Sequence, residues 1–254
     1  MNQDTSQPVV DSFGIDYTQP VFTQLESLGD RYWEWSHVHV TPAFRRELAA
    51  ARPDAPYPDS FPIFAGKWFE AQTHIRWQHV LGVWGTVALA CLIAGVTRPG
   101  FTVLGAAGWW AGGFLLWTLV EYFLHRVVFH KVPTSLLEVK FHFLAHGIHH
   151  KDPWDQTRLV FPILGAIGLA SVLFGLFTAL FEPGAALLLM SGLLAGYLAY
   201  DLGHFAWHHG KSDAAWFKYL KRYHLAHHYQ DMNSRYGVSQ PLWDWVFRSG
   251  NLRV

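Results

Sequence analysis

Histidine is the residue type with the greatest capacity for chemistry in this sequence. The 254-residue chain contains 16 histidines, and most of them fall in four short clusters: EYFLHRVVFH, HFLAHGIHH, YDLGHFAWHH and YHLAHHY. The second and fourth clusters share the order HxxHH. Residues three and four apart lie on one face of a helix, so the imidazoles of each HxxHH group are expected to project together.

The other two clusters have different spacings. His204 and His208 form a pair four residues apart, which also suits one helix face. His125 and His130 are five residues apart, about 140° round an α-helix. One of these two is therefore expected beyond a helix end, near Pro133.

The clustering indicates metal binding. A single histidine is more often a solvated or hydrogen-bonded side chain, but crowded protonated imidazoles would repel one another, whereas neutral imidazoles sharing cations would not. Ten histidines from the four clusters exceed the number of ligands that one ion accepts. Two ions with about five nitrogen ligands each would leave coordination positions open. Imidazole suits iron, zinc, copper and nickel, so the ligand type does not select the metal.

Apolar segments long enough to cross a membrane carry these clusters. They lie at residues 80–97, 101–120, 159–181 and 184–200. A helix needs about 20 apolar residues to span the hydrocarbon core. Only 15% of the chain is charged and 51% is hydrophobic, which is unusual for a soluble domain. We expect four transmembrane helices in two hairpins with tight turns.

The basic residues indicate orientation. Six Lys or Arg precede residue 79, five lie between the second and third segments, and seven follow residue 200. Basic residues accumulate on the cytoplasmic side, so both termini, the middle loop and the histidine clusters are expected to be cytosolic. A bacterial inner membrane and the endoplasmic reticulum both fit this prediction.

The chain before the first apolar segment is mixed in composition. We expect residues 1–78 to form an N-terminal cytosolic segment and residues 79–254 a membrane-embedded domain. Apolar residues at helical spacing predict a short helix at about 20–38, which we expect to pack on the protein rather than lie on the membrane. The Pro-rich stretch at 51–62 predicts an extended loop. The net charge of zero, counting histidine as neutral, argues against nucleic acid as a partner.

The motifs resemble the fatty acid hydroxylase and sterol desaturase superfamily, and most closely the fatty acid 2-hydroxylases acting on sphingolipid acyl chains. The resemblance rests on the four clusters, on HFLAHGIHHKDPWDQTRLVFP and GVSQPLWDWVF, and on DYTQPVFTQLESLGDRYWEWSHVHVTP upstream. It covers about residues 16–248. The combination of HGxHHxxPxDxxRLVFP with LGxxYxEW is more specific than the histidine clusters alone.

The resemblance implies an all-α integral membrane protein with four transmembrane helices and a cytosolic helical cap that holds a dinuclear metal site. It also implies the ligands, position by position: His125, His130, His146, His149, His150, His204, His208, His224, His227 and His228. His142 then stands as a neighbour of the ligands or of the substrate, and His209 as incidental. Asp155 and Asp201 are candidates to orient an imidazole through its other nitrogen, although capping a helix or pairing with a basic residue is an equal alternative.

The implied activity is that of a monooxygenase. Two iron ions, O2 and two external electrons would hydroxylate C2 of a fatty acyl chain, either a free fatty acid or the acyl group of a sphingolipid or ceramide. Zinc binds nitrogen ligands more tightly than ferrous iron, so isolated protein is expected to carry zinc in place of iron. Relatives that fuse an electron-delivering cytochrome domain carry an HPGG motif, which this sequence lacks. We expect a separate electron-transfer protein of the cytochrome or ferredoxin type.

Two alternatives remain at this stage. The first is a sterol, carotenoid or alkane oxidase or desaturase of the same superfamily. The second is a membrane metal transporter or storage protein. Transport sites usually lie near the middle of the bilayer, and the middles of the four apolar segments contain no histidine, which counts against this alternative.

Overall fold

The computed structural model describes residues 8–250, and the ends of the two expected domains, residues 1–7 and 251–254, lie outside this part. The described residues are helical or irregular, with one isolated bridge and no strand. The chain forms two compact units. The first comprises Met1–His74 and Val132–Leu159, and the second comprises Ile75–Lys131 and Val160–Val254.

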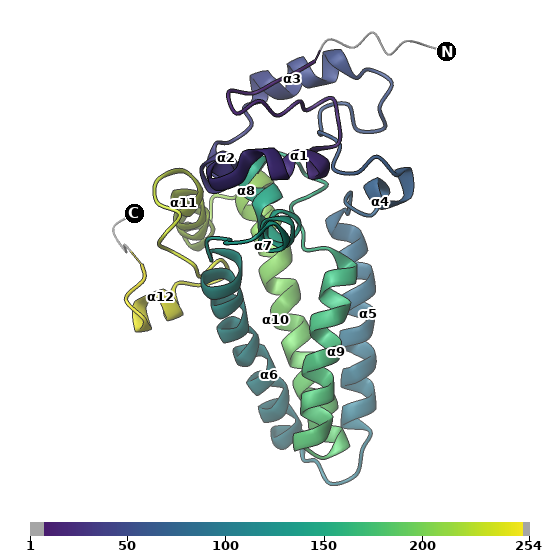
Figure 1. Ribbon diagram of the computed structural model, residues 1–254. Coiled ribbons are helices and arrows are strands. Elements are labelled where there is room, and N and C mark those ends of the chain that lie inside the picture. Colours follow the sequence, from purple (N-terminus) through teal and green to yellow (C-terminus); the bar gives the residue numbers. More distant parts are fainter. Residues whose placement is uncertain (1–7, 251–254) are drawn as a thin grey trace. The chain divides into compact units, whose positions relative to one another are not determined.

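The second unit contains four helices long and apolar enough to cross a membrane. Three are α5 (Trp77–Val96), α9 (Ile163–Leu180) and α10 (Pro183–His209), and the fourth is α6 (Val103–Phe123) with its continuation η2 (Leu124–Phe129). Short connections join α5 to α6 and α9 to α10 (Figure 1). The predictions of four membrane helices and of two hairpins are therefore confirmed.

Helix α10 is the centre of this unit. It packs against α5, α6 and α9. In its 18-residue apolar stretch 72% of the residues are buried, whereas 11% are buried in the corresponding stretches of α6 and of α9. Its start is fixed by Pro183 in the first turn and by Glu182, whose carboxylate accepts from two backbone N–H groups. The fourth apolar stretch ends near residue 200, yet the helix continues to His209, because hydropathy marks the limit of the hydrocarbon core and not the end of a helix.

Two glycines allow α6 and α10 to approach closely. A Cβ atom added to Gly113 would lie 2.0 Å from the Leu189 carbonyl oxygen, and one added to Gly192 would lie 1.9 Å from the Trp110 carbonyl oxygen. Small residues at such crossings let membrane helices meet backbone to backbone. This contact fixes the position of α6 against the helix that carries His204 and His208.

After α10 the chain forms α11 (Ala215–Tyr229), which packs back against α10. A loop then leads to the short helix α12 (Leu242–Val246). The last two histidine-bearing stretches of the sequence are therefore neighbouring helices in the second unit.

The first unit combines the N-terminal segment with the middle loop. Its elements are α1 (Val21–Leu28), η1 (Gly29–Arg31), α2 (Tyr32–His37), α3 (Pro42–Ala51), α4 (Lys67–Ala71), α7 (Leu136–His142), η3 (Phe143–Gly147) and α8 (Ile148–Lys151). The helix predicted at 20–38 is present, interrupted at Gly29, where φ is +49°. Its apolar side chains are buried in the unit's core, as expected.

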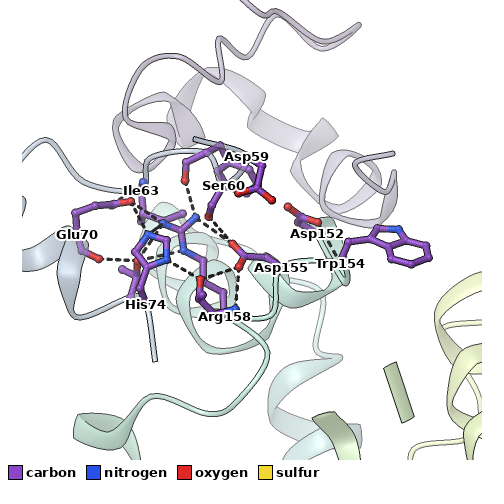
Figure 2. Close-up of polar contacts among 12 residues, drawn as sticks. Asp59, Ser60, Ile63, Glu70, His74, Asp152, Trp154, Asp155 and Arg158 are labelled. Carbon is purple, nitrogen blue, oxygen red and sulfur yellow. Dashed lines mark hydrogen bonds and ion pairs between the residues drawn. The ribbon is translucent and has the colours of Figure 1, made fainter. Parts of the chain in front are cut away.

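A network of buried polar side chains connects segments of the first unit (Figure 2). Arg158, only 6% exposed, donates to the carboxylate of Glu70 (2.6 Å) and to the Phe61 carbonyl (2.5 Å). It also donates to Nε2 of His74 (2.9 Å), while the other ring nitrogen of His74 contacts the Thr157 hydroxyl (2.6 Å). The Pro-rich stretch between α3 and α4, irregular as predicted, is tied through this network to the segment that follows the HGIHH motif.

Candidate metal centre

The first histidine cluster lies on a π-helical turn. Helix α6 changes at Leu124 into η2, and the backbone N–H of His130 donates to the carbonyl of His125 at 3.0 Å. In a π-helix, residues five apart are hydrogen-bonded neighbours, and such turns often mark functional sites. His130 lies at the residue after η2, which confirms that one of the pair is beyond the helix end, and the turn brings both rings to one side.

His227 of α11 completes a group with these two residues, here called the trio. Its Nε2 lies 3.0 Å from Nε2 of His130, which lies 3.2 Å from Nε2 of His125. All three residues are at most 8% exposed. Three imidazole nitrogens from two helices thus converge on one point.

Two backbone carbonyls set the tautomers within the trio. Nδ1 of His125 lies 2.6 Å from the Tyr236 carbonyl oxygen, and Nδ1 of His227 lies 2.6 Å from the Ser234 carbonyl oxygen. A carbonyl can only accept, so each Nδ1 carries the proton and each Nε2 presents a lone pair. This is the arrangement in which a second hydrogen bond orients a metal-binding imidazole.

The loop that supplies these carbonyls is held by two buried carboxylates. Glu121, one turn before His125, accepts from the backbone N–H of Val238 (2.9 Å) and Ser239 (2.7 Å). Asp244, fully buried, accepts from the N–H of Tyr236 (2.9 Å) and Gly237 (2.7 Å). Both carboxylates thus fix the loop whose carbonyls orient the trio.

The backbone of this loop is unusual at two positions, Arg235 and Gly237. Arg235 has φ +61°, an uncommon conformation for a non-glycine residue. A Cβ atom on Gly237 would lie 2.1 Å from the Gln240 carbonyl oxygen and 3.0 Å from the Asp244 carboxylate. The motif GVSQPLWDWVF therefore has a structural role in the centre.

A second group of histidines, here called the quartet, lies beside the trio. It comprises His204, His208, His224 and His228, and one nitrogen of each lies within 4.8 Å of those of the others. Nε2 of His208 and Nε2 of His224 are 2.8 Å apart. The rings of His227 and His228, adjacent on α11, have centroids 5.6 Å apart, so trio and quartet are neighbours within the second unit.

The HGIHH motif lies in the first unit on η3 and α8. The ring centroids of His146 and His150 are 4.5 Å apart, and that of His149 lies 5.9 and 5.8 Å from them. Gly147 leaves room for two side chains there, because a Cβ atom would lie 2.8 Å from both His142 Nδ1 and the Tyr32 hydroxyl. The three imidazoles are buried and close together, as their spacing predicted.

The N-terminal segment supports this motif. The Tyr32 hydroxyl bonds Nδ1 of His142 at 2.6 Å. Lys151, directly after His150, donates to the carbonyls of Trp35 (3.0 Å) and Val38 (2.8 Å), and its ammonium lies 4.6 Å from the Trp35 ring centroid. Burial lowers the pKa of Lys151 to about 8, although Asp11 at 3.8 Å acts in the opposite direction. The LGxxYxEW stretch is thus packed on the HGIHH motif.

The chemistry of these donors fits metal ions. His125 and His227 each direct an unprotonated Nε2 toward Nε2 of His130. A cation satisfies all three, and imidazole is a ligand for divalent transition metals. Among the described residues, His142 and His209 belong to neither candidate group.

The two carboxylates expected to orient an imidazole have other partners among the described residues. Asp201 accepts from the Phe161 N–H (3.1 Å) and the Tyr197 hydroxyl (3.1 Å). Asp155 accepts from the Ser60 hydroxyl and from the Thr157 N–H (2.9 Å) and hydroxyl (2.7 Å). Asp201 anchors the entry to α9 beside His204, and Asp155 belongs to the network of Figure 2.

Sequence reasoning missed the residues that orient the trio. Glu121 stands in an apolar helix four residues before a histidine, and this isolated buried charge was a signal available in the sequence. The Ser234 and Tyr236 carbonyls gave no signal, because a backbone oxygen has no side-chain identity. The fold and site define the protein as a helical integral membrane protein with a histidine-rich centre.

Comparison with known proteins agrees with this class. The family model for fatty acid hydroxylases matches residues 110–249. The chain is 33% identical over 240 residues to dihydroceramide fatty acyl 2-hydroxylase FAH2 of Arabidopsis thaliana, covering 94% of each chain. It is 37% identical over 191 residues to ceramide very long chain fatty acid hydroxylase SCS7 of Saccharomyces cerevisiae, covering 74% of this chain and 49% of that one.

A solved structure matches as well. The hydroxylase domain visible in full-length scs7p aligns with a TM-score of 0.77 and 26% identity, covering 100% of this chain and 95% of that chain. This chain belongs to the fatty acid hydroxylase family, as its motifs predicted.

Proposed function

We propose that this protein is an O2-dependent monooxygenase that hydroxylates C2 of fatty acyl chains in membrane lipids. The observation that carries the proposal is the convergence of neutral imidazole nitrogens in two adjacent groups at the ends of apolar helices. Family membership supports the type of reaction, and the relatives described as acting on dihydroceramide and ceramide acyl chains support the substrate class.

The centre holds two iron ions on ten histidines. The trio would bind one ion and the quartet the other, and His146, His149 and His150 would supply the remaining nitrogens. Five nitrogens at each ion leave a position open, as a catalytic metal requires. The second unit alone already offers three and four of these nitrogens.

The reaction balances as an insertion of one oxygen atom. A C–H bond at C2 becomes C–OH, one O2 and two electrons are consumed with two protons, and water is released. When bound, the two ions supply the activation of O2 and the oxidising power. The protein holds the imidazoles in one tautomer through the Ser234 and Tyr236 carbonyls, and the buried position of the rings excludes water.

The electrons come from a separate protein of the cytochrome or ferredoxin type. Both termini, the middle loop and the metal centre lie on the cytosolic side of the membrane. The distribution of basic residues along the sequence supports this orientation.

Lipid analysis of a host expressing the chain with a reductase partner tests the function. We expect 2-hydroxy acyl lipids in cells with the intact chain and none with His227→Ala or His149→Ala. Both variants should also lose part of the bound metal, because each removes one ligand. His209→Ala is the matched control: it changes the neighbour of His208 outside both groups and should keep product and metal.

Two results would contradict the proposal. The first is iron-loaded wild-type protein that, supplied with a reductase and lipid, forms no 2-hydroxy product. The second is full activity and metal content in His227→Ala, which would remove that residue from the ligand set.

A further inference from the structure

Helix α12 leaves its apolar side chains uncovered. Leu242, Trp245 and Val246 are three and four residues apart, so they lie on one face of the helix. All three are exposed, Trp245 by 66%, and so is Phe247 directly after the helix. Single exposed apolar residues are ordinary on a protein surface, whereas a contiguous group indicates a surface that another molecule covers.

The opposite face of α12 is turned into the protein. Asp244 is two residues from Leu242 and from Val246, which is about 160° away round a helix, and it is fully buried. Its carboxylate accepts from the backbone N–H groups of Tyr236 and Gly237. The helix therefore has its charged side chain inside and its apolar side chains outside, the reverse of the pattern of a helix that faces water.

Contacts with α6 place α12 at the edge of the hydrocarbon core. The indole N–H of Trp243 donates to the Thr118 hydroxyl at 3.0 Å, and the Phe247 ring stacks on that of Tyr122 with centroids 5.3 Å apart. The apolar stretch of α6 ends near residue 120, between these two contacts. Figure 1 shows α12 beside the same end of α6. Tryptophan is enriched at this depth in membrane proteins.

The uncovered face of α12 continues the outer surface of a membrane-spanning helix. Phe123 and Val127, on the span formed by α6 and η2, are exposed, and the ring of Phe123 lies 5.6 Å from that of Phe247. Arg126 and Arg248 are exposed next to these apolar residues in the sequence. A phospholipid has the matching chemistry, because its acyl chains suit the apolar side chains and its phosphate suits the two guanidinium groups.

The size of the surface distinguishes a lipid from a protein partner. A stable protein–protein interface takes about 20–30 residues a side. The uncovered face of α12 offers only the four side chains named above, which is too little for such an interface. A bilayer needs no minimum area, because it covers whatever apolar surface lies at its depth.

We propose that α12 is an interfacial helix whose outer face is covered by phospholipids of the bilayer, and that this contact holds Asp244 and its loop in place. The loop carries the Ser234 and Tyr236 carbonyls, which accept from Nδ1 of His227 and of His125. The bilayer thereby supports the orientation of the trio. The proposal concerns the placing of α12 and does not rest on the proposed function.

Nitroxide labels test the depth of α12. Cys91 is the one cysteine of the sequence, so Cys91→Ser gives a background for Trp245→Cys and Leu242→Cys. The labelled proteins are placed in phospholipid nanodiscs, and power saturation compares collisions with O2, which dissolves in lipid, and with a water-soluble nickel chelate. We expect labels on α12 to collide mainly with O2, like a label in Val172→Cys, since Val172 is 70% exposed on α9. A label in Asp213→Cys, at an exposed polar position, should collide mainly with the chelate.

Trp245→Asp tests the link between lipid contact and the trio. A carboxylate is costly against lipid, so α12 should move away from its place beside α6. Zinc bound to the protein in nanodiscs should then be lost to a competing chelator at a roughly 10-fold lower concentration, the lower end of the effect of losing an outer partner of a metal site. Trp245→Leu is the matched control, because it keeps an apolar side chain and should retain zinc like the wild type.

Three outcomes overturn the proposal. The first is a label at position 245 that collides with the nickel chelate as often as the label at position 213. The second is a label at position 245 that collides with neither reagent, which would show that protein covers this face. The third is equal zinc retention in Trp245→Asp and Trp245→Leu. Absence of hydroxylated lipid product would contradict the proposed function and leave these three measurements unaffected.

Discussion

Replacing Asp244 with asparagine tests a residue that supports the metal centre but is not one of its expected ligands. The Asp244 carboxylate accepts from the backbone N–H groups of Tyr236 and Gly237 at 2.9 and 2.7 Å. It also accepts from the Ser249 hydroxyl at 2.8 Å. The Tyr236 carbonyl, on the residue so held, fixes the tautomer of His125.

The size of the effect follows from these bonds. Asp244 is fully buried, and a hydrogen bond to a charged acceptor contributes about 1.5–3 kcal/mol. The asparagine amide keeps one acceptor oxygen and turns its NH2 group toward an N–H that also donates. We expect a loss of about 3 kcal/mol in the free energy of unfolding. Loss of outer partners of a metal site weakens metal binding about 10- to 100-fold, and we expect the lower part of this range.

Two measurements on the purified protein check this prediction. Metal retained after equilibration with increasing concentrations of a competing chelator gives the relative affinity. Thermal unfolding in the same detergent gives the change in stability. Asp213→Asn is the control, because Asp213 is exposed and pairs with Lys218 at 2.8 Å; such surface pairs contribute little.

The reasoning is refuted if folded Asp244→Asn protein retains metal as tightly as the wild type while Asp213→Asn behaves normally. Loss of stability without loss of metal affinity would equally refute it, since the loop would then support the fold and not the imidazoles.

Three further predictions concern the fold and the metal. Burial and the charge of Arg158 lower the pKa of His74, so the unfolded state takes up this proton first. Stability should therefore fall as the pH drops below about 6.5, and His74→Gln should reduce that fall in pH-dependent thermal unfolding. Contact with His74 and Arg158 outweighs burial and lowers the pKa of Glu70, so stability should fall again below about 4.5, and Glu70→Gln should make this second step smaller. Gly113→Ala should destabilise the protein by about 1–3 kcal/mol, whereas Gly108→Ala, with open space around its added Cβ atom, should be nearly neutral in the same assay.

The membrane helices could be predicted because hydropathy acts over long segments. All four were expected, and the structure has them; the fourth apolar stretch ends near residue 200, whereas α10 ends at His209. Hydropathy falls where the chain leaves lipid, while the backbone hydrogen bonds of the helix continue to His209. The ends of elements depend on local bonds that composition does not reveal.

The grouping of histidines followed from helical spacing only in part. His204 and His208 on α10, and the His224–His228 motif on α11, lie together as their spacing indicated. The pair His125 and His130 needed a π-helical turn, which no α-helical periodicity predicts. The assignment of Asp201 and Asp155 as candidates to orient imidazoles rested on proximity in sequence, whereas backbone carbonyls of a distant loop perform that task for the trio.

Helix α10 is a single uninterrupted helix that packs among the membrane helices and also carries two histidines of the quartet. The turns embedded among α5, α6 and α9 and the turn carrying His204 and His208 share a continuous ladder of backbone hydrogen bonds from Pro183 to His209. A thinner bilayer or a micelle of unsuitable size would tilt the turns of α10 that lie among α5, α6 and α9. This tilt would reach the two imidazoles through the helix. We therefore expect a change in the thickness of the surrounding lipid to alter the spacing of the His204 and His208 nitrogens.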